Sequence, residues 1–186
     1  MKKHQNIPKW LQEARNKWQY VGKERPPFAA TPKKGQRSVW DFPRPPAIEK
    51  ESREIIVRYN SIALATTRNA LAILETASPP TFYIPPSAVH GDQLQAVTGR
   101  SSFCEWKGKA VYWALRSSQD LIVGWSYPNP LEPYALLRDH IAFYPQKLEC
   151  SLGGERVQPQ PGLFYAGWIT SDLSGPFKGE PGTGHW

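Results

Sequence analysis

A mainly β fold with irregular extensions is predicted by three features of this 186-residue sequence. Short apolar segments are separated by turn residues roughly every 8–12 residues, which is typical of all-β domains. The chain holds 19 prolines and 14 glycines, more than is usual for a globular protein of this size. No apolar run approaches the roughly 20 residues of a membrane helix. We therefore expect one domain with its own hydrophobic core and an extension at each end.

Residues 1–51 are predicted to form a basic arm. Up to residue 47 the chain carries 11 Lys/Arg and 3 Asp/Glu, whereas the remainder is nearly neutral. Apolar residues recur at helical spacing over residues 8–20, which predicts a short helix. Residues 21–48 contain six prolines and should be extended. The apolar patch at residues 38–42 is expected to dock this segment on the domain surface.

The domain is predicted to span residues 52–157, and residues 158–186 form a tail. Predicted strands cover residues 54–59, 62–66, 70–75, 81–84, 121–126, 141–144, 148–150 and 155–157, with a hairpin around residue 108 and a helical turn or two within 131–137. The first of these strands are expected to form a meander. The tail is rich in Gly, Pro and aromatic residues. Because disordered tails are usually poor in aromatics, we expect it to pack on the domain.

The hairpin around Gly108 concentrates polar and aromatic side chains in a short stretch. A two-residue turn that begins at Gly108 places Cys104 opposite Trp113. In this register Lys107 and Tyr112 share one face of the hairpin, whereas Cys104 lies on the other face. We interpret the first face as the floor of a site and the second as core.

The two cysteines, Cys104 and Cys150, form no CxxC pair, which favours free thiols. Cys104 is a candidate nucleophile. The predicted register nevertheless places it among tryptophans on the apolar face, where a thiol behaves as a small hydrophobic group. We therefore interpret Cys104 as a packing residue.

No metal site is expected, because the four histidines, at positions 4, 90, 140 and 185, lack ligand spacing.

The first residues are charged and lack the apolar region of a signal peptide. We therefore expect a soluble, cytoplasmic protein that has no membrane partner.

Four blocks of the sequence between residues 54 and 150 form a set of motifs. The blocks are Glu75-Thr76 with Pro79-Pro80 and Tyr83; Cys104 with Lys107-Gly108 and Tyr112-Trp113; Trp125-Ser126-Tyr127-Pro128; and Ala142-Phe143-Tyr144-Pro145. In this order they resemble the domain of unknown function 427 family, in a longer variant with a basic N-terminal arm and a Gly/Pro/aromatic tail. The resemblance implies a β-tent of two small antiparallel sheets set at an angle. Related tents often hold zinc with two CxxC pairs, which this chain lacks.

Members of that family are sometimes labelled predicted nucleotidyltransferases. Such chemistry usually relies on magnesium held by carboxylates and on a cradle for the phosphates. The sequence contains no Asp-x-Asp pair and no Gly-x-x-x-x-Gly-Lys-Ser/Thr loop. The residues therefore give this label little support, and the cofactor, if there is one, stays open.

The resemblance makes Lys107 and Glu75 the candidate catalytic residues. Lys107 can bind an anionic group, or act as a nucleophilic amine if it is desolvated. Glu75 can serve as a general base or can orient Lys107. The structural alternatives are a surface lysine beside a turn and a solvated carboxylate at a strand end.

Four aromatic residues are candidate ligand contacts, because their rings stack on a ligand and a phenol can also form a hydrogen bond with it. They are Tyr83, Tyr112, Trp125 and Tyr127. The alternative for each is an ordinary core position.

Two functions of different classes follow. In the first, the two candidate catalytic residues and the four aromatic residues form a pocket for an unidentified, anionic small molecule, with or without catalysis. In the second, the chain is a non-catalytic interaction module whose basic arm binds nucleic acid or a protein, since basic residues attract phosphates and indoles stack on bases. We favour the pocket, with the tryptophans of the arm attaching it to its own domain.

Overall fold

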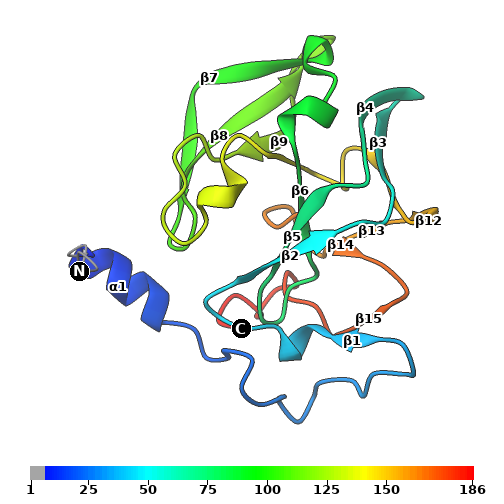
Figure 1. Cartoon of the computed structure of the whole chain (residues 1–186). Coiled ribbons are helices and arrows are strands. Elements are labelled where there is room, and N and C mark those ends of the chain that lie inside the picture. The colour runs from blue at the N-terminus through cyan, green and yellow to red at the C-terminus, as the bar shows by residue number, and fades with distance from the viewer. Residues whose placement is uncertain (1–6) are drawn as a thin grey trace.

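The computed structural model describes residues 7–186, so residues 1–6 at the start of the predicted arm lie outside the described residues. The predicted mainly β fold with a short N-terminal helix is confirmed (Figure 1). No helix in the described part of the chain is long and apolar enough to cross a membrane.

The elements follow one another in a simple order along the chain. They are α1 (Lys9–Asn16), β1 (Arg37–Ser38), η1 (Val39–Asp41), β2 (Ala47–Glu51), β3 (Ile55–Tyr59), β4 (Ile62–Thr67), β5 (Ala70–Leu74), β6 (Thr81–Ile84), η2 (Pro86–Ala88), η3 (Gly91–Gln93), β7 (Leu94–Cys104), β8 (Gly108–Leu115), β9 (Ser118–Ser126), η4 (Ala135–Leu137), β10 (Ile141–Phe143), β11 (Glu149–Leu152), β12 (Glu155–Arg156), β13 (Gln158–Pro159), β14 (Trp168–Ile169) and β15 (Leu173–Ser174).

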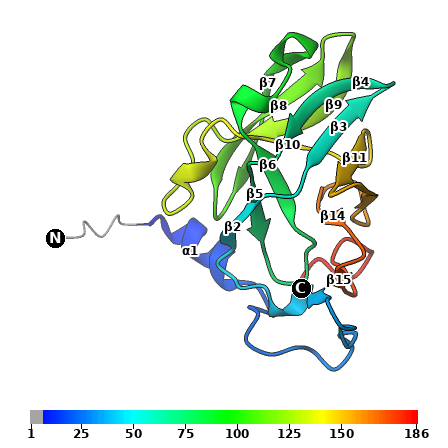
Figure 2. The ribbon, with the colours of Figure 1, turned by 45° about the vertical axis from the view of Figure 1, so that its right-hand side comes forward.

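Two antiparallel sheets form the body of the molecule. The larger has seven strands in the order β2-β5-β6-β10-β9-β8-β7, and the smaller has four in the order β12-β11-β3-β4. Figure 2 shows the β3–β4 hairpin in front of the long strands of the larger sheet. The predicted meander is wrong at one point, because β4 and β5 are consecutive in the chain but belong to different sheets. The reason is that β5 pairs with β2 on one side and with β6 on the other, which leaves β4 at the edge of the smaller sheet.

The two faces of the larger sheet carry different side chains. Because successive residues of a strand point to opposite faces, Phe82 and Ile84 of β6 face the main core, whereas Tyr83 faces the other way. Register extends this second face across the sheet, since Tyr83 pairs with Ala142, Ala142 with Trp125 and Trp125 with Tyr112. The second face therefore presents a row of aromatic side chains away from the main core.

The N-terminal arm is part of the folded body. The segment 47–51, which the sequence placed in the arm, is the edge strand β2 and pairs with β5. The patch at residues 38–42, which was expected to dock the arm on the domain surface, reaches further, because Trp40 within it is fully buried in the main core. The helix α1 ends at Asn16, so the predicted helix was too long at its C-terminal end.

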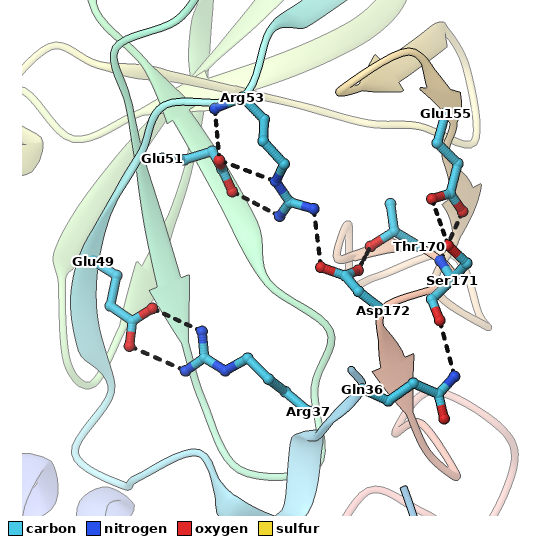
Figure 3. A network of polar contacts seen from close by, with 9 residues as sticks. All are labelled: Gln36, Arg37, Glu49, Glu51, Arg53, Glu155, Thr170, Ser171 and Asp172. Atoms are coloured by element: carbon cyan, nitrogen blue, oxygen red, sulfur yellow. Dashed lines mark hydrogen bonds and ion pairs between the residues drawn. The ribbon is translucent and has the colours of Figure 1, made fainter. Parts of the chain in front are cut away.

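A network of polar contacts joins the arm and the tail to the sheets (Figure 3). Arg37 binds Glu49 through two hydrogen bonds of 2.8 and 3.0 Å. Arg53 bridges β2 and the tail, with contacts of 2.7 Å to Glu51 and 2.9 Å to Asp172. Exposed pairs of this kind each contribute little to stability. The fully buried Trp40 of the arm and Trp168 of the tail therefore contribute more to holding the extensions in place.

Candidate functional site

A cavity of about 540 Å³ lies on the aromatic face of the larger sheet. Its size is in the range of small-molecule sites, roughly 300–1,000 Å³. All six residues singled out from the sequence line it, namely Glu75, Tyr83, Lys107, Tyr112, Trp125 and Tyr127. The sequence pattern thus identified side chains that the fold brings to one place from β6, β8, β9 and the segments that adjoin β5, β8 and β9.

The aromatic walls of the cavity contact one another. The Tyr83 ring lies 6.2 Å from the rings of both Trp125 and Tyr127, measured between centroids, and Trp125 lies 4.8 Å from Tyr144. A bulge in β9 shifts the register where Gly124 pairs with Trp113. After this shift Trp125 faces the cavity and Val123 faces the main core.

The predicted register of the hairpin is wrong. Cys104 pairs with Gly108, so β7 and β8 are joined by the three residues 105–107 and not by a two-residue turn at Gly108. Gly108 has a φ of +95°, which suits glycine, but it occupies the first position of β8. The main chain of Leu131 donates to the Lys107 carbonyl at 3.0 Å and holds this loop against the cavity.

The change of register moves Cys104 to the cavity. A different register exchanges the faces of a strand, so Cys104 lies on the same side as Tyr112 and not beside Trp113. Cys104 is half-buried and lines the cavity, and Trp106 lines it as well. Cys104 therefore does not share a face with Trp113, as the predicted register had it, but packs against the second aromatic cluster beside the cavity.

Lys107 is a buried cation inside the cavity. Only 7% of the residue is exposed. The alternative interpretation, a surface lysine beside a turn, therefore does not hold. Within residues 7–186 its ammonium makes no ion pair. Its neighbours are the thiol of Cys104 and the phenol of Tyr83. Burying a charge is costly unless an opposite charge compensates it, so this arrangement is suited to a bound anion.

The surroundings of Lys107 favour its charged form. Burial by itself lowers the pKa of the amine, but Cys104, Tyr83 and Glu75 act in the opposite direction and outweigh it. The pKa therefore lies above the ordinary lysine value, and the side chain is an ammonium at neutral pH. A nucleophilic amine must be unprotonated. Of the two roles open to Lys107, anion binding fits this environment better.

Glu75 lines the cavity beside a buried arginine. Arg44, whose side chain is 1% exposed, donates from Nε to Glu75 at 3.1 Å. Its other nitrogens donate to the carbonyl oxygens of Tyr20 and Thr76 at 2.7 and 3.0 Å. The Glu75 carboxylate is thus oriented by the arm and makes an ion pair with Arg44, not with Lys107.

The phenols of the cavity stay protonated at neutral pH. Burial raises the pKa of Tyr83 to about 12 and raises the pKa of Tyr127 as well. Both hydroxyl groups can therefore donate a hydrogen bond to an anionic ligand. Tyr112, nearer the rim, donates to Ser102 Oγ at 2.8 Å.

The arm and the tail complete the cavity, which the sequence did not predict. Lys17 and Trp18 line it from the arm, and Tyr165 and Lys178 line it from the tail. The Trp18 indole donates to the Glu105 carboxylate at 3.0 Å. The aromatic content of the tail indicated that it packs on the domain, but no local pattern indicated which face it covers.

Lys178 is a second buried lysine, with 1% of the residue exposed. Its ammonium lies 3.7 Å from the centre of the Trp18 ring and donates to the main-chain oxygen of Trp186 at 2.9 Å. Burial, with the charge of Arg44 as the second cause, lowers its pKa to about 8.

The Lys178→Met substitution should therefore change how stability depends on pH. The folded chain releases this proton near pH 8 and the unfolded chain near 10.5. Between these values the unfolded state binds more protons, so the contribution of Lys178 to stability rises with pH. Urea denaturation should show the free energy of unfolding of the wild type, relative to Lys178→Met, to be higher at pH 10 than at pH 7. A difference that does not change with pH would contradict this assignment.

The charges around the cavity are predominantly positive. Five basic side chains line it, against three acidic ones. They are Lys17, Arg100, Lys107, Lys147 and Lys178, against Glu75, Glu105 and Asp120. Since Glu75 is paired with Arg44, the net field in the cavity attracts anions.

The arginines of the arm are used within the fold. Arg25 pairs with Asp41 at 2.6 Å, Arg37 with Glu49 at 2.8 Å, and Arg44 with Glu75. Trp40 is buried, and Trp18 packs against three cationic side chains. These contacts attach the arm to its own domain.

The fold and the site together define a mainly β domain with two antiparallel sheets and a cationic, aromatic-lined cavity. In residues 7–186 no group of three or more His, Cys, Asp or Glu side chains is arranged to hold a metal ion. The family described as domain of unknown function (DUF427) matches residues 47–153, more than half of the chain, so the chain belongs to this family. The match confirms the resemblance seen in the sequence motifs. A comparison with curated proteins finds no match.

Proposed function

We propose that the cavity binds a small organic anion with a planar, apolar body. The observation that carries this proposal is Lys107, which is 93% buried, charged, and without an ion pair in the described chain. Cys104, Tyr83 and Glu75 keep this amine charged, but none of them forms an ion pair with it. An anionic ligand supplies the missing ion-pair partner when it binds.

The remainder of the cavity fits the body of such a ligand. Rings from Tyr83, Trp125 and Tyr144 provide flat apolar surfaces, and planar molecules stack on these at low cost. The hydroxyl groups of Tyr83 and Tyr127 supply donors beside the Lys107 ammonium. Anionic recognition at one end and stacking along the walls together define the proposed ligand class.

In this proposal Glu75 is a positioning residue and not a general base. Its carboxylate accepts from Arg44 and contributes to the field around Lys107. This contact couples the arm to the cavity, because Arg44 also holds the Tyr20 carbonyl. The arm then orders the cavity wall in addition to covering it.

The experiment is mass spectrometry of the small molecules released from three natively purified proteins. They are the wild type, Lys107→Met and the control Lys109→Met, which removes the same charge from an exposed position two residues away. We expect one or more organic anions to be enriched with the wild type and the control, and to fall at least about tenfold with Lys107→Met, the effect of one charge-assisted hydrogen bond. The proposal is wrong if the same anions copurify equally with all three proteins, or if the retained compounds are cations.

A further inference from the structure

The two cysteines of the chain lie in opposite settings. Cys150 on β11 is 4% exposed within the main core, and burial raises its pKa to about 12. Cys104 ends β7, is half-buried, and lines the cavity next to the Lys107 ammonium. Reactive thiols are found in partly exposed, electropositive places, whereas buried structural thiols are inert. Cys150 is thus an internal reference for Cys104.

Polar groups around Cys104 are arranged for chemistry at its sulfur. The thiol donates to the Glu105 carboxylate, with Sγ 3.8 Å from Oε2. Lys107 lies on the cavity side of the same short loop, next to the sulfur. Cys104 is thus flanked by a carboxylate that can accept the thiol proton and by a cation that can hold an anionic reagent.

Independent observations at the same loop point to a ligand. The charged Lys107 side chain has no ion-pair partner between residues 7 and 186, although only 7% of it is exposed. Trp106, 6% exposed, also lines the cavity, and its indole Nε1 has no hydrogen-bond partner in the described part of the chain. Buried donors are rarely left unsatisfied. The unsatisfied indole donor of Trp106 and the unpaired charge of Lys107, both beside one thiol, point to an anionic acceptor at this end of the cavity.

We propose that Cys104 is a reactive thiol of the cavity and that the ligands include anionic electrophiles, held by Lys107 and attacked by the Cys104 sulfur. This inference rests on the proposed function, because it uses the same anion site. It adds a covalent step that binding alone does not require. The simplest member of the class is a carboxylate with a leaving group on the adjacent carbon.

The alkylation of Cys104 by iodoacetate illustrates this covalent step. Its carboxylate binds Lys107, which directs the CH₂ carbon to Sγ. The carbon–sulfur bond forms as the carbon–iodine bond breaks, and iodide leaves with the bonding electron pair. The thiol proton passes to the Glu105 carboxylate and then to water. The product is a carboxymethyl thioether at Cys104.

The test compares iodoacetate with the neutral reagent iodoacetamide on the native full chain. Peptide mass spectrometry gives the alkylation rates of Cys104 and Cys150 in the wild type, Lys107→Met and Lys109→Met, with glutathione as the free thiol. We expect Cys104 to react and Cys150 to stay unmodified. The iodoacetate-to-iodoacetamide rate ratio at Cys104 should exceed that of glutathione by about tenfold in the wild type and the control, and should return to the glutathione value in Lys107→Met.

Two results would overturn the proposal: a Cys104 as unreactive as Cys150, or a wild-type ratio equal to that of glutathione. Binding of the aromatic anion 8-anilino-1-naphthalenesulfonate separates failure of the covalent step from failure of the anion site. If its affinity still depends on Lys107 while Cys104 is inert, only the covalent step is wrong. If neither the ratio nor this affinity responds to Lys107→Met, the anion site is wrong as well.

Discussion

Replacing Trp40 by alanine should lower the free energy of unfolding by about 4 kcal/mol, the usual cost of truncating a buried aromatic side chain. Trp40 is fully buried and contacts three other aromatic rings, with centroids 5.1 to 5.3 Å away. They belong to Tyr20, Phe28 and Trp186. Its indole donates to the Pro176 carbonyl at 3.1 Å. The substitution therefore removes contacts that bring together the arm, the tail and the core.

Urea denaturation measures this loss, and Trp10→Ala is its control. Trp10 lies in the same arm, is 54% exposed, and contacts one ring, that of Phe103 at 5.2 Å. We expect its replacement to cost less than about 1 kcal/mol, as for most surface positions. If Trp40→Ala lowered the free energy of unfolding no more than Trp10→Ala does, Trp40 would not be part of the stabilising core. Deletion of the arm is a poor test of nucleic-acid binding for the same reason, since it also removes Trp40 from the core.

Most strands were predictable because their signals are local. The segment 81–84 is bounded by proline pairs and contains apolar and aromatic residues, and the structure places β6 at the same residues. The pairing of strands was harder to predict. The contact of β3 with β11 joins segments about 90 residues apart in the chain, and turn residues between neighbouring segments carry no information about it. The predicted meander failed between β4 and β5, because β5 pairs with β2, which precedes the predicted domain.

The candidate site was predictable in composition but not in geometry. The family motifs named six side chains that line one cavity. The hairpin register was misjudged because a glycine signals a positive φ without signalling its position in the loop. The actual loop has three residues, 105–107, which brings Cys104 to the cavity. The contributions of Trp18 and Lys178 come from the two ends of the chain, so they follow from packing and not from any local pattern.

Lys107→Met should have the largest effect on ligand binding of any single change in the cavity. A hydrogen bond to a charged group contributes about 1.5–3 kcal/mol, or roughly 10- to 150-fold in affinity. Methionine has a similar length and no charge, so the fold should be retained. The neighbours of Lys107 favour its charged form in the folded chain, so the variant loses this interaction and should be no more stable than the wild type without ligand. Thermal denaturation checks that second expectation.

The most direct test of an anion site at Lys107 is a paired fluorescence titration. The probes 8-anilino-1-naphthalenesulfonate and N-phenyl-1-naphthylamine share one ring system and differ by the sulfonate. We expect Lys107→Met to weaken binding of the sulfonate at least about tenfold and to change binding of the neutral probe less than about threefold. Lys109→Met should leave both unchanged. Equal affinities of the wild type and Lys107→Met for the sulfonate, or equal losses for both probes, would contradict the proposed role of Lys107.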